Sequence, residues 1–295
     1  MSKKKKVLVA DGVDDILLKG LTRMGYSVNY NPDIEYREVL KIVGEYSGIV
    51  INTRTPAPRE LLEKAVQLQW IARLGSGLDI IDLDEAKNRK VEVINSPEGN
   101  ANAVAEHMLG MLLCLLRNIN RADREMRAMV WNREKNRGRE LGSMTVGIIG
   151  FGNTGSAFAK VLRGLGCKIL VYDKYKTNYN GEDIQVMECE SMEEVLKNAD
   201  VVSLHLPLNK ETHALADKEF FTGCKKGAIF LNSSRGKLTV TRDLLVALEE
   251  GPLGGACLDV FENEKPNTFT PNEKNTFKKL AARQDVILSP HIAGW

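Results

Sequence analysis

The chain has 295 residues, of which 43% are hydrophobic and 27% charged, as in soluble globular proteins with room for two domains. A formal net charge of +2 is too small to indicate nucleic acid as a partner. The five cysteines lack metal-site or redox-motif spacing, so we expect small core residues, no bound metal and a reducing, cytoplasmic environment. The longest apolar block, 108–116, is too short to cross a membrane, and we expect no signal peptide.

The first part of the chain alternates short apolar runs with helical patterns. The pattern predicts helices at 14–24 and 59–65, and it predicts strands at 7–10, 27–30, 48–51, 70–74 and 91–94. Alternation of this kind is typical of a parallel sheet covered by helices. The sequence therefore predicts a first α/β domain of flavodoxin-like type at residues 1–97.

A break and a long helical pattern follow this domain. Proline and glycine interrupt the pattern at 96–99, where we expect a hinge. Apolar residues then recur at helical spacing, which predicts one helix from about 102 to 131. Its length and its arginine-rich distal half indicate packing on something beyond its own domain. Two interpretations stay open, the interface of a homodimer and an ordinary interdomain helix.

A glycine-rich turn comes directly after the apolar run 146–149, which has the character of a buried strand. Gly150 permits a tight turn, Gly152 lets backbone approach a pyrophosphate, and Gly155 lets the following helix pack close to the strand. This order of strand, turn and helix is typical of a dinucleotide-binding βαβ unit. A glycine-rich turn in some other α/β protein is the alternative.

The residues after the turn fit the same interpretation. The helix N-terminus, with Asn153 and Thr154, would attract the charge of a phosphate. A second apolar run ends at Asp173, at the distance expected for a βαβ unit. Its carboxylate would accept hydrogen bonds from a ribose diol and repel a 2′-phosphate, which favours NAD over NADP as the cofactor.

The alternation of strands and helices then resumes, which predicts a second, Rossmann-type domain at residues 98–290. Further strands are expected at 201–204, 228–231, 255–258 and 286–288, and a long surface loop is expected at 262–276. The fold class is thus α/β, with two parallel-sheet domains, one flavodoxin-like and one Rossmann-like, joined by a hinge.

Ligands of an open parallel sheet lie beyond the carboxyl ends of its strands, so the residues that follow each strand are the candidates for chemistry. In the second domain they include an acid, Asp259, a guanidinium, Arg235, and an imidazole, His291. A 2-oxo acid that accepts a hydride needs a proton donor at its keto oxygen, a role that suits histidine. Its carboxylate needs a bidentate cation, which is arginine rather than lysine.

Ordered blocks over essentially the whole chain resemble one family, the D-isomer-specific 2-hydroxyacid dehydrogenases, particularly their phosphoglycerate dehydrogenase branch. The blocks are 72–82, 97–106, the glycine turn, 205–212, 232–236, 258–264 and 289–294. The resemblance implies an NAD-dependent oxidoreductase. It also implies that residues 291–295 begin a C-terminal segment that returns to the first domain.

The resemblance assigns three catalytic residues. Arg235 would bind the substrate carboxylate and polarise the keto oxygen, and His291 would be the general acid in reduction and the general base in oxidation. Glu264 would pair with His291 and raise its pKa. Many relatives have proline directly after this glutamate, whereas Lys265 follows it here, and Glu262 is the alternative partner of the histidine.

The resemblance also adds cofactor and substrate contacts. Cofactor contacts are implied for His205, Pro207, Ser233 and Asp259, the last of them near the nicotinamide carboxamide. Ser76 and Gly77 resemble the loop whose N–H groups hold the substrate carboxylate. In relatives that act on a phosphorylated acid an arginine commonly stands at the position of Asn52, and Arg54 is the candidate to replace it.

The substrate therefore has two interpretations. Oxidation of 3-phosphoglycerate in serine biosynthesis is the leading one, and reduction of hydroxypyruvate or glyoxylate is its competitor, favoured by Asn52. A third interpretation, from another class, is an NAD(H)-responsive binding or corepressor-like protein without turnover.

Overall fold

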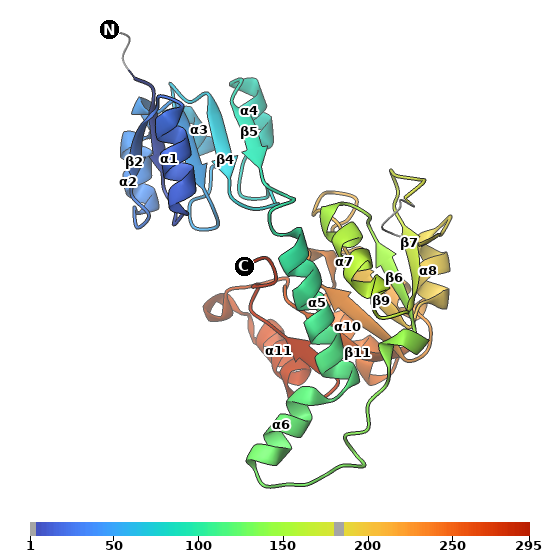
Figure 1. Cartoon of the computed structure of the whole chain (residues 1–295). Coiled ribbons are helices and arrows are strands. Elements are labelled where there is room, and N and C mark those ends of the chain that lie inside the picture. Colours follow the sequence, from blue (N-terminus) through green and yellow to red (C-terminus); the bar gives the residue numbers. More distant parts are fainter. Residues whose placement is uncertain (1–3, 180–185) are drawn as a thin grey trace. The chain divides into compact units, whose positions relative to one another are not determined.

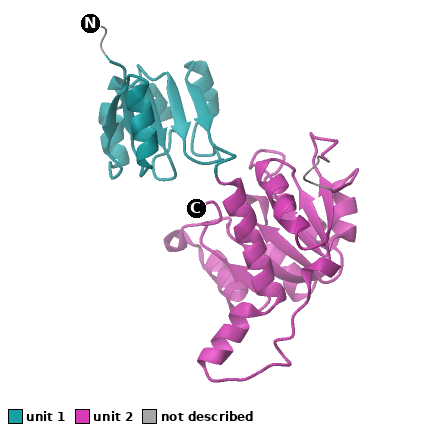
Figure 2. Ribbon diagram, viewed as in Figure 1, with its two compact units in different colours: residues 1–99 teal, residues 100–295 magenta. Residues whose placement is uncertain are grey.

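Two parallel β-sheets, one in each of two units, organise the chain. The computed structural model describes residues 4–179 and 186–295 (Figure 1). The first unit is Met1–Gly99 and the second is Asn100–Trp295 (Figure 2). The predicted hinge, 96–99, ends at this boundary, and residues 291–295 lie within the second unit.

The first unit contains a five-stranded sheet in the order β2-β1-β3-β4-β5, with every pair of neighbours parallel. This is the flavodoxin-like strand order, as the sequence predicted. The strands are β1 (Lys6–Val9), β2 (Ser27–Tyr30), β3 (Gly48–Ile51), β4 (Trp70–Arg73) and β5 (Glu92–Asn95). The helices are α1 (Asp15–Arg23), α2 (Tyr36–Ile42), α3 (Arg59–Lys64) and α4 (Leu83–Asn88), with a 3-10 turn at Val43–Glu45.

Two of these helices, α2 and α4, were not predicted. The N-terminus of α4 nevertheless has a capping residue that the sequence shows, because Asp82 is its N-cap and accepts a side-chain hydrogen bond from the N–H of Glu85. An acid three residues before a glutamate is a common helix-start signal. The helix has only six residues, so its apolar spacing is too short to be recognised by periodicity alone.

The second unit contains a seven-stranded parallel sheet in the order β12-β11-β10-β9-β6-β7-β8. Its strands are β6 (Thr145–Ile149), β7 (Lys168–Tyr172), β8 (Met187–Glu188), β9 (Val201–Leu204), β10 (Ala228–Asn232), β11 (Leu253–Leu258) and β12 (Val286–Leu288). The strand order reverses between β6 and β9, as in the doubly wound Rossmann fold. The predicted α/β fold class is thus confirmed.

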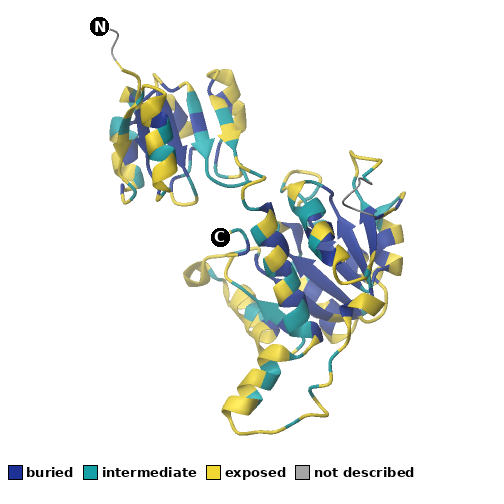
Figure 3. Cartoon of the chain, in the orientation of Figure 1, coloured by how far each residue is buried: buried dark blue, intermediate teal, exposed yellow. Residues whose placement is uncertain are grey.

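Helices cover both faces of this sheet, whose central strands are almost entirely buried, whereas the edge strand β8 is exposed (Figure 3). One core lies against α5 (Ala101–Leu116) and α7 (Asn153–Arg163). The other lies against α8 (Met192–Asn198), α9 (Lys218–Thr222), α10 (Thr241–Glu249) and α11 (Pro271–Ala282). The remaining elements are α6 (Ile119–Arg127) and 3-10 turns at Leu141–Ser143, Gly236–Leu238 and Pro266–Thr268.

The prediction of one helix from 102 to 131 was wrong. Helix α5 ends at Leu116, and α6 begins at Ile119 and ends at Arg127. Asn118 lies between them with a φ of 54°, in the left-handed region. Asparagine tolerates that region better than most residues, so it breaks the helix without interrupting the apolar spacing.

The predicted surface loop at 262–276 was wrong in its second half. Helix α11 begins there, with Thr270 as its N-cap and Pro271 in its first turn. The Thr270 side chain accepts a hydrogen bond from the N–H of Glu273, and the Glu273 side chain accepts one from the N–H of Thr270. This capping box was visible in the sequence.

The predicted placement of the cysteines is correct for three of the five. Cys189, Cys224 and Cys257 are buried, whereas Cys114 and Cys167 are half-buried, and all five are free thiols. Burial raises the pKa of the Cys224 thiol to about 12, so this thiol stays protonated and unreactive at neutral pH. In the parts of the chain that the structure describes, no helix is both long and apolar enough to span a membrane.

Candidate active site

The glycine turn after β6 has the geometry of a phosphate cradle. Gly150 has a φ of +94°, and a Cβ there would lie 2.4 Å from the carbonyl oxygen of His205. A Cβ on Gly155 would lie 2.1 Å from the carbonyl oxygen of Gly150. A Cβ on Gly152, by contrast, would meet nothing within 4 Å, so the space in front of this residue is open. Gly152 is also the N-cap of α7, whose first N–H groups can bind a phosphate there.

Asp173 ties the end of β7 to this turn. Its Oδ2 accepts a hydrogen bond of 2.7 Å from the N–H of Phe151. Its Oδ1 accepts hydrogen bonds from the N–H groups of Tyr175, at 2.9 Å, and Lys176, at 3.1 Å. The carboxylate therefore shapes the turn after β7, in addition to the ribose contact predicted for it.

The His205 side chain supports the glycine turn through hydrogen-bond contacts. It is buried, with Nε2 2.8 Å from Ser203 Oγ and Nδ1 3.3 Å from Thr154 Oγ1. Burial lowers the pKa of His205 to about 3, so the imidazole is neutral at physiological pH. The His205 side chain thus joins β9 to the first turn of α7. Pro207, the next predicted cofactor contact, accepts a hydrogen bond at its carbonyl oxygen from Thr212 Oγ1.

Arg235 lies on a turn built by the buried Asn232 at the end of β10. The Asn232 amide donates to the carbonyl oxygen of Arg235, at 3.0 Å, and accepts from the N–H of Ser234, at 2.9 Å. A Cβ on Gly236 would lie 1.8 Å from the carbonyl oxygen of Phe261, so only glycine lets the turn approach the segment after β11. Arg235 donates from Nη1 to the carbonyl oxygen of Ser234.

Asp259 holds the segment that carries His291. Its fully buried carboxylate accepts hydrogen bonds from Ser289 Oγ, at 2.6 Å, and from the N–H groups of Ile292 and Ala293, at 2.9 and 2.8 Å. The Asp259 carbonyl oxygen accepts from the N–H of His291, at 2.7 Å. His291 has a φ of 56°, a left-handed conformation that these contacts stabilise.

His291 and Glu264 form a pair, with Nδ1 and Oε2 2.9 Å apart. The hydrogen bond with Glu264 raises the pKa of His291 and outweighs burial, which lowers it. Burial raises the pKa of Glu264, but the hydrogen bond from His291 brings the net pKa below its usual range. The charge of Arg235 lowers the pKa of both groups, so the guanidinium is near enough to act on the pair electrostatically.

The alternative partner, Glu262, has another role. Its Oε2 accepts a hydrogen bond of 2.6 Å from the N–H of Thr241, at the start of α10. A carboxylate at the N-terminus of a helix is stabilised by the helix dipole. The partner of the histidine in this structure is therefore Glu264, even though Lys265 stands where many relatives have proline.

The candidates in the first unit are engaged within that unit. Arg54 Nε lies 3.5 Å from Asp11 Oδ1, and the guanidinium also contacts Asp33 and the carbonyl oxygen of Pro32. The carbonyl oxygen of Ser76 accepts a hydrogen bond of 2.7 Å from Asn95 Nδ2, which fixes the loop containing Gly77 to the end of β5. The charge of Arg54 is therefore partly balanced by two carboxylates.

Ser233 supplies an independent sign of a ligand in the second unit. This residue is buried at the end of β10, and among the described side chains its Oγ is one of few buried polar atoms without a hydrogen-bond partner. A buried hydroxyl without a partner costs free energy unless a ligand completes its hydrogen bonds. Together with the open space at Gly152, it fits a bound dinucleotide.

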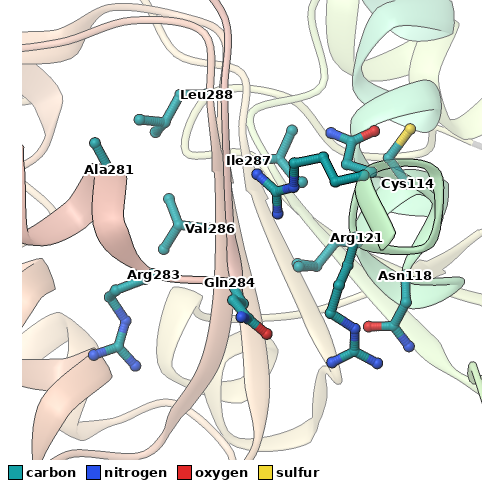
Figure 4. A pocket seen from close by; sticks show the side chains of 12 residues that line it. Cys114, Asn118, Arg121, Ala281, Arg283, Gln284, Val286, Ile287 and Leu288 are labelled. Carbon is teal, nitrogen blue, oxygen red and sulfur yellow. The ribbon is translucent and has the colours of Figure 1, made fainter. Parts of the chain in front are cut away.

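A hollow of about 220 Å³ lies elsewhere, between the α5–α6 region and β12 (Figure 4). Its lining includes Cys114, Asn118, Arg121, Arg283 and Ile287. None of the predicted site residues lines it. In residues 4–179 and 186–295, no group of three or more His, Cys, Asp or Glu side chains is placed to hold a metal ion.

Comparison with known proteins identifies the family. Residues 109–293 match the D-isomer specific 2-hydroxyacid dehydrogenases in their NAD binding domain, and the chain belongs to this family. The family and the cofactor predicted from the sequence, NAD, are thus confirmed.

Two curated relatives are both D-3-phosphoglycerate dehydrogenases. The one from Archaeoglobus fulgidus is 33% identical over 288 residues, which are 98% of this chain and 53% of the relative. The one from Bacillus subtilis is 37% identical over 247 residues, which are 84% of this chain and 45% of the relative. The chain therefore spans about half the length of these relatives.

Solved structures of other members are similar over nearly the whole chain. A D-lactate dehydrogenase from Aquifex aeolicus, complexed with NAD and lactic acid, is 28% identical with a TM-score of 0.82, covering 98% of this chain and 89% of that one. A glyoxylate reductase from Paecilomyes thermophila is 25% identical with a TM-score of 0.86 and the same coverage.

Several residues that support the candidate site were not singled out from the sequence. Asn232 and Ser289 lie within blocks that carry the family resemblance but were given no role there, and His107 was not among the candidate site residues. His107 Nε2 lies 2.9 Å from Ser289 Oγ and 3.6 Å from Asp259 Oδ1. A buried acid followed much later by Ser-Pro-His gives no periodic signal, so only the fold reveals this contact.

Proposed function

We propose that the protein is an NAD-dependent oxidoreductase that interconverts a D-2-hydroxy acid and its 2-oxo acid. The observation that carries the proposal is the His291–Glu264 pair within the electrostatic influence of Arg235. All three lie on turns at the carboxyl ends of strands in the sheet that also ends in the glycine turn. NAD, when bound, supplies the hydride acceptor, or the donor in the reverse direction.

The residues of the chain supply binding and proton transfer. Arg235 binds the substrate carboxylate and polarises the oxygen at C2. His291 Nδ1 is engaged by Glu264, so Nε2 exchanges the proton with that oxygen. The buried carboxylate of Asp259 holds the backbone of the histidine turn in place.

The Glu264 contact predicts a pH dependence. Reduction needs protonated His291 and is lost as pH rises through the pKa of this group, which Glu264 raises. Glu264→Gln should therefore move the alkaline limb of reduction to lower pH and lower the rate at pH 8 by roughly tenfold. For oxidation, which needs neutral His291, the acidic limb should move in the same direction. Steady-state profiles of kcat/KM check this, and an unmoved limb contradicts the pairing. Glu262→Gln is the matched control.

The leading substrate is 3-phosphoglycerate, oxidised to 3-phosphohydroxypyruvate in serine biosynthesis. The curated relatives described above carry the name of this activity. The engagement of Arg54 by Asp11 and Asp33 favours the competitor, a hydroxypyruvate or glyoxylate reductase, since a balanced arginine attracts a phosphate less.

NADH oxidation with 3-phosphohydroxypyruvate, hydroxypyruvate, glyoxylate and pyruvate separates the two. We expect kcat/KM to be at least about tenfold higher for the phosphorylated acid, because a charge-assisted contact contributes about 1.5–3 kcal/mol. Arg54→Ala should then abolish the preference while changing the rate with glyoxylate little. A preference for glyoxylate or hydroxypyruvate would establish the reductase instead.

We further propose that the protein is a homodimer through the region 102–131. Met129 and Trp131, just after α6, are 93% and 81% exposed. Exposed apolar side chains in one segment are typical of an interaction surface. The hollow beside α5 and α6 combines apolar side chains such as Ile287 and Leu288 with arginines such as Arg121 in its lining (Figure 4). In a two-fold dimer the apolar segment of each copy would occupy the hollow of the other.

Light scattering after gel filtration tests the dimer. Met129→Lys should weaken association at least about tenfold and yield a monomer at micromolar concentration, because it removes an apolar contact and places a positive charge beside Arg121 and Arg124 in the lining of the hollow. Met24→Lys is the matched control, since Met24 is exposed in the first unit and should leave the mass unchanged. A monomeric wild-type protein would contradict the proposal.

We also propose a cytoplasmic location. The support is chemical, because all five cysteines are free thiols and a reducing compartment preserves them. Fractionation of the source cells with compartment markers tests this location, and recovery from an oxidising compartment would contradict it.

A further inference from the structure

The turns that follow β7 and β9 are joined by a cluster of side chains above the end of β6. Strand β6 lies between β7 and β9 in the sheet. Glu211 Oε2, on the turn after β9, accepts hydrogen bonds from Lys174 Nζ, at 2.7 Å, and from the Tyr175 hydroxyl, at 2.8 Å, both on the turn after β7. We call these three residues the Glu211 bridge. It spans the strand that leads into the glycine turn.

A rigid turn presents Glu211. The Asn209 side chain accepts hydrogen bonds from the N–H groups of Glu211, at 2.8 Å, and Thr212, at 3.0 Å. Thr212 Oγ1 donates to the carbonyl oxygen of Pro207, at 2.6 Å. Bonds of this kind between a short polar side chain and nearby backbone fix a turn. The backbone that carries Glu211 is therefore fixed by hydrogen bonds within its own turn.

The opposite side of the bridge is equally well defined. Asp173 Oδ1 accepts from the N–H of Tyr175, and its Oδ2 accepts from the N–H of Phe151 in the glycine turn. Lys174 Nζ lies 5.6 Å from the centre of the Tyr175 ring. The residue proposed to bind the ribose thus also fixes the turn that carries the two donors of the bridge.

The bridge contributes little to folding. The side chains of Lys174 and Glu211 are each 57% exposed, and an exposed ion pair adds little to stability because water and salt screen its charges. The hydrogen bonds from Lys174 and Tyr175 lower the pKa of Glu211, and the hydrogen bond with Glu211 raises the pKa of Lys174, so both are charged at neutral pH. What distinguishes the cluster is its position, next to Asp173 and across the end of β6.

We propose that the Glu211 bridge closes the adenosine end of the cofactor site and slows release of the dinucleotide. In a Rossmann fold the pyrophosphate lies at the glycine turn and the adenosine ribose lies at the acid after the second strand, here Asp173. The Glu211 bridge lies beside this acid, on the path by which the adenosine would enter and leave the cofactor site. This inference rests on the NAD-dependent function proposed above and adds a positioning residue, Glu211, to it.

Ligands that share only part of the dinucleotide test the inference. NADH and ADP-ribose contain the adenosine, whereas reduced nicotinamide mononucleotide lacks it. For Glu211→Gln we expect Kd for NADH and ADP-ribose to rise about threefold to tenfold, mainly through a faster dissociation rate. The Kd for the mononucleotide should stay the same. Added salt should speed NADH release from the wild type more than from the variant, because it screens the ion pair.

Two further variants provide controls. Tyr175→Phe keeps the ring and removes one of the two donors, so it should change NADH release in the same direction by a smaller factor. Glu249→Gln removes another exposed carboxylate in the same unit, which lies 3.8 Å from Lys279 Nζ, and should leave all three ligands unaffected.

Two outcomes would overturn the inference. One is an unchanged dissociation rate of NADH from Glu211→Gln, and the other is an equal loss of affinity for the mononucleotide, which would indicate general damage to the site. All readouts are binding constants and rates, so they do not depend on turnover. Wild-type protein that binds NADH but reduces no 2-oxo acid would contradict the proposed function and leave this test intact.

Discussion

Replacing Arg235 by alanine should lower kcat/KM by roughly 10²- to 10⁴-fold, because in its proposed role Arg235 both binds the substrate carboxylate and places a positive charge beside the reacting oxygen. The melting temperature should change by no more than about 2–4 °C, the effect of about 1 kcal/mol in a protein of this size. The turn itself is built by Asn232 and Gly236, which the substitution leaves in place. Steady-state kinetics and thermal unfolding of the same preparation check both expectations.

Arg235→Ala should also change the pH profile of the reaction, which the loss of a merely structural residue would not do. Arg235 lowers the pKa of His291, so its removal should move the alkaline limb of the residual reduction to higher pH. Arg235→Lys should recover the position of this limb but only part of the rate, because an ammonium cannot bind the carboxylate bidentately. Arg242→Ala, an exposed arginine on α10, is the control. Wild-type kinetics in Arg235→Ala would remove the assignment.

Much of this site could be predicted because parallel strands place their carboxyl ends along one edge. The apolar runs before Gly150, Asp173 and Arg235 are short and bounded by polar residues, so their ends could be located from the sequence. Glu264 was different. A glutamate in a polar segment has no periodic signal, and only the resemblance to a family pointed to it before the structure placed it 2.9 Å from His291.

What could not be predicted depends on contacts between distant segments. The inward orientation of His205 is set by Ser203 and Thr154, which come together only in the folded sheet. The break at Asn118 depends on one left-handed residue within a continuous apolar pattern. In the first unit the carboxylates that engage Arg54 come from two other turns, so its altered electrostatic environment was not visible in the motif.

Replacing Asp259 should cost the protein considerable stability. This residue was predicted as a cofactor contact, yet its fully buried carboxylate accepts hydrogen bonds from Ser289, Ile292 and Ala293. Asp259→Ala would leave these buried donors without an acceptor. Each bond to a charged group contributes about 1.5–3 kcal/mol, so we expect a loss of about 3–5 kcal/mol in the free energy of unfolding. Urea unfolding followed by circular dichroism measures it.

Asp259→Ala should also lower kcat, because the Asp259 carboxylate holds the turn that carries His291. His291 has a left-handed backbone, and the two N–H groups that follow it are those that the Asp259 carboxylate holds. Without that acceptor the turn can relax, and a displaced proton donor should lower kcat by roughly 10²-fold or more even where the variant remains folded. Asp259→Asn separates the two effects, because its single amide oxygen can still accept one of the two backbone bonds. For Asp259→Asn we expect a stability and a kcat that lie between those of the wild type and those of Asp259→Ala. If Asp259→Asn matched the wild type in both, the carboxylate would not be what positions His291.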